Sequence, residues 1–366
     1  MDWAWRRWDI CWATGSSASC EAPIATTLTP RFGLCCQFLD SPIRFRTATH
    51  RFVSTLTAAR RRSYLAAIAA DNAAALAAAV EQCAALGIGA FRINSQILPL
   101  GTHPVSRYTL DALDRKGEIR AAFERAGALA RARDVRLSFH PDQFVVINSE
   151  RAAVVRSSVE ELEFQAVTAE LIGASTLVFH GGSTAGGVPA ALERLERGLD
   201  LLSERARSRA ALENDDHRFA PSDLLPLCRR AGVPLVYDVH HHRCHGDGLL
   251  VDEATELAAA TWGEREPWAH ISSPRDGWDS SNPRPHADYI DPADFPESWL
   301  GRRMTVDVEA KAKERAVVRL LEETRAMDQC HPDRGGYMPD AARPPSSGAA
   351  GASASSRRTR GMTSRP

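Results

Sequence analysis

The sequence contains eight cysteines in 366 residues but has no CxxC motif. Cys35 and Cys36 are adjacent within a predicted buried strand, and the other cysteines do not show the close spacings of a small secreted disulfide framework. We therefore expect reduced thiols, no structural disulfides and a cytosolic compartment.

The sequence also lacks a long apolar run and an excess of charge of either sign. No apolar stretch approaches the roughly 18 residues that a membrane helix needs, and the N-terminus has no hydrophobic region with a small-residue cleavage site. We therefore expect no membrane contact. The net charge is -1, so overall charge does not indicate nucleic-acid binding. Any contact with DNA must come from a local patch or from bound cations.

What the sequence does contain is an alternation of short apolar runs, typical of strands, with predicted helices, and this alternation occurs eight times. The first strand is expected at 31–36, a helix at about 71–86 and the second strand at 87–94. Further helices are expected to begin at 148–149 and at 221–222. The pattern predicts an α/β fold, a parallel (β/α)8 TIM barrel with its active site at the C-terminal ends of the strands.

The two ends of the chain do not share this pattern. Residues 1–30 contain four tryptophans among scattered arginines and are treated as an unassigned N-terminal extension. Residues 31–330 form the predicted barrel domain. Residues 331–366, dominated by Pro, Gly, Ser, Ala and Arg, are expected to be a disordered tail. Residues 272–299 are expected to form a long functional loop after the seventh strand.

Most of the later strands end on a residue type that can bind a metal. A single histidine at the end of a strand is more often a structural residue than a metal ligand. His140 and His180, however, each stand at the end of a predicted strand, and the two strands are consecutive along the chain. This repetition favours a ligand role for both. Glu213 is out of phase with the apolar Leu212, so it points into the barrel if Leu212 packs against the helices. A buried carboxylate needs a cation.

Asp238 ends the sixth strand and is followed by three histidines. We expect at least one of His240 and His242 to be only a solvated loop residue. Four further candidates come from this turn, the seventh strand, the loop after it and the eighth strand: His241, His270, His286 and Glu309. Glu309 could instead be the first-turn acid of a helix. Imidazoles mixed with carboxylates favour Zn, Mn or Fe over Ca, and the absence of cysteine argues against a structural zinc cage.

His103 follows the second strand, where Asn94 and Gln96 also face the mouth of the barrel. We interpret His103 as a residue that contacts substrate or supports the metal ligands, with a structural role as the alternative. It is the second candidate catalytic residue, after Glu213.

In this order the motifs resemble the UV damage endonuclease family, whose barrel is related to those of endonuclease IV and xylose isomerase. The resemblance covers about residues 31–323. The matching segments are Thr102-His103-Pro104, His140-Pro141-Asp142-Gln143, His180-Gly181-Gly182, Leu212-Glu213-Asn214-Asp215, residues 238–242, His270 and Val308-Glu309-Ala310-Lys311.

The resemblance implies a site for up to three divalent metal ions, which we expect to be Mn²⁺, with Zn²⁺ or another divalent ion as the alternative. Glu213 would bridge two of the ions. The other ligands would form three groups: His140 with His180, Asp238 with His270 and Glu309, and His241 with His286.

The function implied is that of a metal-dependent DNA-repair endonuclease acting on double-stranded DNA. It would cut the phosphodiester bond 5′ to a UV photoproduct and leave a 3′-hydroxyl and a 5′-phosphate. Paired metals suit this reaction because they activate a water and stabilise the leaving oxygen. A sugar isomerase or epimerase on the same barrel is the alternative, but it would not need His140 and His180. A non-enzymatic DNA-lesion-binding protein is the second alternative, but the ligand set has no obvious gap.

The expected DNA-binding residues lie around this mouth. Gln143 and Phe144 are expected to probe the lesion, although Phe144 could instead pack beneath a helix. The remaining candidate DNA contacts are Asn94, Gln96 and Lys311. We expect a cytoplasmic, nucleoid-associated monomer.

Three positions depart from the family pattern. Leu34 stands where the family often has an aromatic residue, and Phe144 stands where Tyr is common. Trp268 occupies a position where some members carry Lys near the metals. The departures bear on lesion choice and on the electrostatics of the metals.

Overall fold

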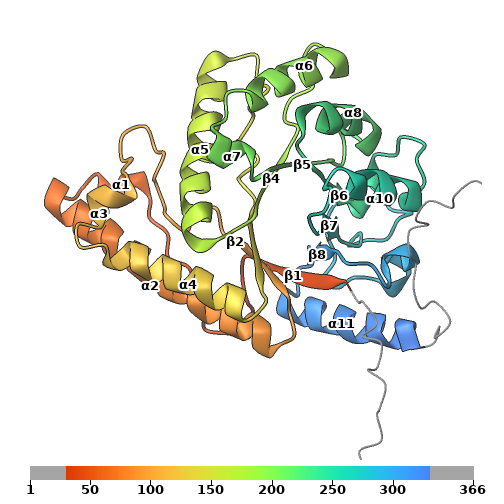
Figure 1. Cartoon of the computed structure of the whole chain (residues 1–366), viewed down its shortest axis with the longest axis horizontal. Helices are drawn as coiled ribbons and strands as arrows, with labels where there is room; N and C mark the ends of the chain where they lie inside the picture. Colours follow the sequence, from red (N-terminus) through yellow and green to blue (C-terminus); the bar gives the residue numbers. More distant parts are fainter. Residues whose placement is uncertain (1–29, 330–366) are drawn as a thin grey trace, which may run out of the picture.

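The structure of the protein is a computed structural model that describes residues 30–329. Within these residues, eight parallel strands close into a barrel in chain order, so the predicted (β/α)8 barrel is confirmed (Figure 1). The strands are β1 Arg31–Cys35, β2 Ala90–Ile93, β3 Arg136–Phe139, β4 Thr176–His180, β5 Ala210–Glu213, β6 Leu235–Asp238, β7 Trp268–Ile271 and β8 Thr305–Val308.

Helices follow the strands and surround the barrel in Figure 1. The longer ones are α2 Ala58–Ala85, α4 Glu118–Ala132, α5 Ala152–Ile172, α6 Val188–Leu199, α8 Pro221–Ala231, α10 Val251–Ala260 and α11 Glu314–Gln329. The short ones are α1 His50–Val53, α3 Leu110–Leu113, α7 Glu204–Arg207, α9 Val239–Cys244 and the 3₁₀ turns η1 Pro292–Asp294 and η2 Glu297–Trp299.

Local chemistry explains where several helices begin and end. α8 begins at Pro221 and is followed by Gly232 in the left-handed region, as predicted. α2 begins earlier than expected, because Thr57 caps it by accepting a hydrogen bond from the Arg60 amide. α5 begins later than expected, at Ala152. Asn148 is instead buried and its side chain accepts a hydrogen bond from the Ser183 amide at 2.8 Å, which ties two loops together.

Side chains inside the barrel form layers, because alternate residues of each strand point inward. One buried layer consists of Ala90, Val178, Ala211, Val236 and Trp268, packed with Trp262. It is separate from the larger core between the strands and the helices. Two residues further along the same strands, nearer their C-terminal ends, come Arg92, His180, Glu213, Asp238 and His270. The fold therefore brings these five polar side chains to one mouth.

α2 corrects one expectation from the sequence. By length and composition it could cross a membrane, with a mean hydropathy of 1.4 in its most apolar window, so the prediction that no apolar stretch approaches that length is wrong. In the barrel α2 lies along α4 (Figure 1) and buries Leu65, Ile68, Leu76 and Val80. Its apolar residues thus pack as those of a core helix.

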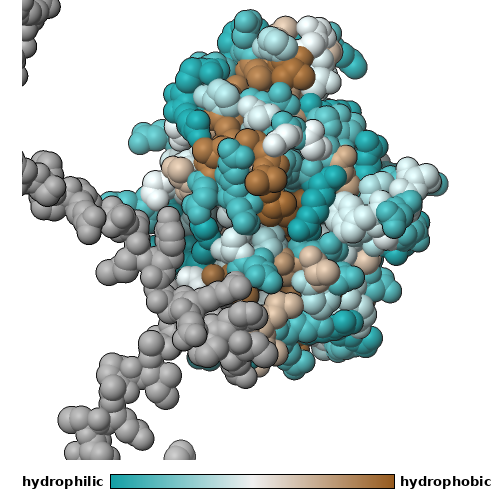
Figure 2. All heavy atoms as spheres, turned by 90° about the vertical axis from the view of Figure 1, so that its right-hand side faces the viewer, coloured by the Kyte–Doolittle hydropathy of each residue, from teal (hydrophilic) through white to brown (hydrophobic). Residues whose placement is uncertain are grey.

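The face that carries α8 and α10 is largely hydrophilic, with apolar groups gathered in a band through its upper half (Figure 2). Apolar groups of this kind are normal on a surface in contact with water. The cysteines of the described residues, Cys35, Cys36, Cys83, Cys228 and Cys244, all carry free thiols. The predicted tail at 331–366 and the predicted extension, apart from residue 30, lie outside the described residues.

Candidate active site at the mouth of the barrel

Eight of the candidate ligands lie at the C-terminal mouth of the barrel, and we call them the mouth cluster. They are His140, His180, Glu213, Asp238, His241, His270, His286 and Glu309. They come from β3 to β8 and from the segments that follow these strands.

Glu213 lies at the centre of the mouth cluster and is buried. Its Oε2 atom is 2.7 Å from His140 Nε2 and 3.8 Å from His180 Nε2. Its Oε1 atom is 2.9 Å from His270 Nδ1 and 3.5 Å from His241 Nδ1. Each carboxylate oxygen therefore faces a different pair of imidazoles.

Asp238 closes one side of the cluster. Its Oδ2 atom is 3.5 Å from His241 Nδ1, while its Oδ1 atom accepts a hydrogen bond from the His241 amide at 2.7 Å. Asp238 is thus the N-cap of α9 as well as a wall of the site. Its Oδ2 atom is buried and has no hydrogen-bond partner among the described residues, so it is available to a cation.

Glu309 closes the other side. Its Oε1 atom is 3.5 Å from His270 Nδ1 and its Oε2 atom is 3.6 Å from His286 Nδ1. Arg92, which the sequence analysis did not single out, forms an ion pair with Glu309. The ring centroids of His241 and His286 are 6.4 Å apart.

The carboxyl groups and the imidazoles of the mouth cluster shift each other's pKa values. Burial opposes ionisation of Glu213, but His270, His180 and His140 hold the pKa of this carboxyl well below its ordinary value. Burial likewise opposes the charge on His270, but Glu213 and Glu309 raise its pKa to about 9. The ionised Glu213 carboxylate and the His270 imidazolium thus favour each other's charged form, whereas burial lowers the pKa of His180.

The residues present fit a multinuclear metal centre. Two sets of three ligand atoms lie within 4.8 Å of one another, one from His140, His180 and Glu213 and the other from Glu213, Asp238 and His241. The two sets share Glu213, and mixed imidazole and carboxylate ligands suit zinc, manganese or iron.

The structure places His103 apart from this cluster. Its ring lies parallel to that of His50, with centroids 4.3 Å apart, and its Nδ1 accepts hydrogen bonds from the Val105 and Ser106 amides at 3.2 Å. Within residues 30–329, no hydrogen bond or ion pair joins His103 to the mouth cluster.

The candidate lesion-binding residues are accessible. Phe144 is 76% exposed, which excludes the alternative that it packs beneath a helix. Gln143, Gln96 and Lys311 are also exposed, and Asn94 is half-buried. Leu34, in contrast, is buried in the core between strands and helices, so it cannot contact a lesion in this structure.

His240 and His242 correct another expectation, because both are buried in α9 and neither is a solvated loop residue. His242 lies between the Tyr237 hydroxyl, 2.7 Å from its Nδ1, and an Asp247 oxygen, 2.9 Å from its Nε2. His240 Nε2 is 3.2 Å from the Arg284 carbonyl oxygen. His240 therefore anchors the loop that carries His286.

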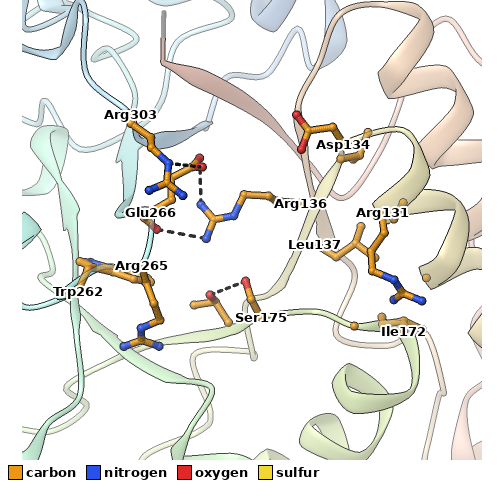
Figure 3. Close-up of a pocket in the computed structure, with 15 residues that line it drawn as sticks. Arg131, Asp134, Arg136, Leu137, Ile172, Ser175, Trp262, Arg265, Glu266 and Arg303 are labelled. Carbon is orange, nitrogen blue, oxygen red and sulfur yellow. Dashed lines mark hydrogen bonds and ion pairs between the residues drawn. The ribbon is translucent and has the colours of Figure 1, made fainter. Parts of the chain in front are cut away.

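A cavity of about 430 Å³ lies at the opposite, N-terminal end of the barrel (Figure 3). Glu266 is one of the residues that line it, and its Oε1 atom is 3.3 Å from Arg136 Nη1 and accepts a hydrogen bond from Thr305 Oγ1 at 2.6 Å. Arg136 also lies over the Trp268 ring, 4.2 Å from its centroid. No residue of the mouth cluster lines this cavity. The N-terminal end of such a barrel usually contributes stability rather than catalysis.

The fold and the mouth cluster together define a (β/α)8-barrel enzyme with a histidine–carboxylate site. Comparison with known proteins agrees. A model of the family described as UV-endonuclease UvdE matches residues 30–337. A UV DNA damage endonuclease from Deinococcus radiodurans is 33% identical over 83% of this chain and 97% of its own length. One from a Nostoc species is 30% identical over 80% of this chain and 89% of its own length. The chain belongs to the UV-endonuclease UvdE family.

Solved structures support the same assignment. The crystal structure of SacUVDE has a TM-score of 0.73 and 25% identity, covering 82% of this chain and 99% of that one. Endonuclease IV from Thermus thermophilus, with a TM-score of 0.54 and 18% identity over 81% of this chain and 100% of that one, shares the fold. Membership of the family and the names of the two relatives above identify the protein as an endonuclease, in preference to the sugar isomerase and the non-enzymatic binding protein.

Proposed function

We propose that this endonuclease is metal-dependent and cuts double-stranded DNA immediately 5′ to UV photoproducts, leaving a 3′-hydroxyl and a 5′-phosphate. The observation that carries the proposal is the position of Glu213, whose two oxygens each face a separate pair of imidazoles. One carboxylate placed in this way can serve two cations at once. Divalent ions bound here, Mn²⁺ in our proposal and up to three in number, would activate a water and stabilise the leaving oxygen.

The chain's own residues would arrange the rest of the reaction. His140 and His180 would hold one ion against Glu213. Asp238 and Glu309 would hold a second ion together with His270, and both carboxylates are already oriented by partners on the protein. His270 would bind beside Glu309, and His241 and His286 would complete the ligand set.

Charge at the mouth explains how a protein with a net charge of -1 could bind DNA. Three divalent ions would exceed the charge of Glu213, Asp238 and Glu309, so the loaded mouth would attract phosphate. The exposed Lys311 and Gln96 and the half-buried Asn94 and His103 would contact the strand around it. Such an enzyme would act in the cytoplasm at the nucleoid, and we expect a monomer.

Lesion recognition would fall to Gln143 and Phe144. Phe144 follows the His140 segment directly and is 76% exposed, so it can enter the duplex beside the site. An inserted side chain that fills the space left by unstacked bases costs a few kcal/mol, and less at a distorted lesion. This difference in cost would favour damaged DNA.

The test is a nicking assay on UV-irradiated plasmid with Glu213→Gln. Loss of one anionic ligand shared by two ions should abolish nicking while the barrel stays folded. Glu124→Gln is the matched control, because Glu124 is exposed on α4 and should leave nicking unchanged. Nicking by Glu213→Gln at near the wild-type rate would reject the proposed centre.

A further inference from the structure

Asp307 is a fully buried carboxylate that the sequence analysis did not identify. It lies on β8 between Thr305 and Glu309 and is paired in register with His270 of β7 and Gly33 of β1. Its relative exposure is 0%, and neither of its oxygens has a hydrogen-bond partner of ordinary geometry within the described part of the chain. An unsatisfied buried carboxylate is costly, so its presence needs an explanation.

Two donors beside Asp307 lack partners in the same way. The Nε1 atom of Trp268 and the Nε2 atom of His270 are both buried and make no hydrogen bond of ordinary geometry among residues 30–329, although the Trp268 side chain interacts with the Asp307 carboxylate. His270 Nε2 is 3.7 Å from Asp307 Oδ2, and the opposite ring atom, Nδ1, is 2.9 Å from Glu213. A small rotation of either side chain would bring the His270–Asp307 pair to hydrogen-bond distance, about 3 Å.

Because Gly33 has no side chain, there is room beside it for the Asp307 carboxylate. A Cβ atom at Gly33 would lie 2.1 Å from Asp307 Oδ1, closer than any real contact. A side chain at residue 33 would therefore displace Asp307 from beneath His270. The interior of the barrel thus accommodates the Asp307 carboxylate beside His270 Nε2, whereas the Glu213 carboxylate lies beside His270 Nδ1.

We propose that Asp307 is a positioning residue for the metal centre. It accepts the Nε2–H of His270 and so holds the ring with Nδ1 directed at the metal side, where Nδ1 is the atom that would give up its proton to bind a metal, while Trp268 donates the second hydrogen bond to the carboxylate. This inference rests on the proposed function. A histidine ligand commonly donates its other N–H to a carboxylate in this way, which fixes the tautomer and the ring orientation.

The experiment measures the Kd for Mn²⁺ by calorimetric titration of the metal-stripped full-length protein. Asp307→Leu removes both acceptors at similar size, and Gly33→Ala displaces the carboxylate without replacing it. Each should weaken Mn²⁺ binding by about 10- to 100-fold. Asp307→Asn, which keeps one acceptor, should lose less affinity.

Val236→Ala is the matched control, because Val236 lies buried in an interior layer of the barrel beneath Asp238. It should lower the free energy of unfolding of the metal-free protein and leave the Kd unchanged. Wild-type Kd values in Asp307→Leu and Gly33→Ala, or an equal loss in Val236→Ala, would overturn the role of Asp307. Failure of the wild-type protein to bind Mn²⁺ would instead reject the metal centre itself, and the Asp307 inference with it.

Discussion

Glu213 shows how single residues define this site. It is 1% exposed, and burial opposes its ionisation, but the imidazoles of His270, His180 and His140 hold the pKa of its carboxyl well below the ordinary value. A buried anion held this way costs stability unless it is compensated. The four imidazoles around Glu213 form two pairs, one facing each carboxylate oxygen. We infer from this arrangement that the imidazoles serve the function of the site as well as compensating the buried charge.

His140 and His180 give the first prediction at this scale. Replacing both with Ala should remove about one metal ion per chain and abolish nicking, because the Glu213 Oε2 atom would lose both of its imidazoles. Elemental analysis of the purified protein measures the ion count. His245→Ala, with a half-exposed side chain outside the cluster, should keep the wild-type count. Unchanged metal content in the double variant would contradict the assignment.

Gln143 and Phe144 give a second prediction. The double change to Ala should lower cleavage of photoproduct-containing DNA and reduce its binding preference over undamaged duplex. Metal content and thermal stability should stay at wild-type values, because both side chains are exposed. Binding to matched damaged and undamaged duplexes, measured at one salt concentration, provides the test. An unchanged preference would show that another residue probes the lesion.

Site residues that stand in a recognisable pattern along the chain could be predicted from the sequence. Site residues whose role depends on contact with a distant part of the chain could not. The phase of Glu213 relative to Leu212 predicted that it points inward, and it does. The same alternation along β8 directs both Asp307 and Glu309 into the barrel. Asp307 was nevertheless missed, because an acidic residue in the middle of a strand belongs to no recognisable motif. Arg92 was missed for a similar reason, because its ion pair with Glu309 joins strands 217 residues apart.

At the scale of elements, strands were predicted better than helix ends. Short apolar runs, most of them bounded by Gly or Pro, mark the strands, whereas α2 is alanine-rich and gives no amphipathic boundary at its start. α9 was predicted as a turn because three consecutive histidines look solvated. Its ring nitrogens instead find partners at Tyr237, Asp247 and the Arg284 carbonyl, contacts that exist only after folding.

The N-terminal end of the barrel gives a prediction about stability. Glu266 binds Arg31, Arg136 and Thr305, so Glu266→Gln should lower the free energy of unfolding by about 1–3 kcal/mol. The exposed neighbour Glu264 provides the control variant Glu264→Gln, which should be neutral. Urea denaturation measures both. Nicking per folded molecule should not change, because the mouth lies at the other end; a loss of nicking without a loss of stability would contradict the assignment of this end to stability.

At the scale of the whole molecule, the protonation of the mouth couples stability to metal binding. Burial opposes the charge on His241 and His270, but neighbouring carboxylates raise the pKa of each from 6.5 to about 9. Since the folded pKa lies above the unfolded one, this stabilisation is complete below pH 6.5 and is lost as the pH rises through 9.

The metal-free protein should therefore lose stability between pH 6.5 and pH 9, while its affinity for Mn²⁺ rises over the same range because metal ligands must be deprotonated. Urea denaturation and metal titration at three pH values within this range measure the two trends. A metal-free protein that gains stability across this range would contradict the proposed protonation of the mouth.

The proposed function requires bound divalent metal for this chain to cut DNA beside a UV lesion. The direct measurement maps the cut made by the full-length protein in a duplex that carries one photoproduct at a defined position, before and after metal removal. We expect a single nick immediately 5′ to the photoproduct, with a 3′-hydroxyl that a polymerase can extend, lost on metal removal and restored by Mn²⁺. The same nick from metal-stripped protein, or no nick after Mn²⁺ is restored, would contradict the proposed function.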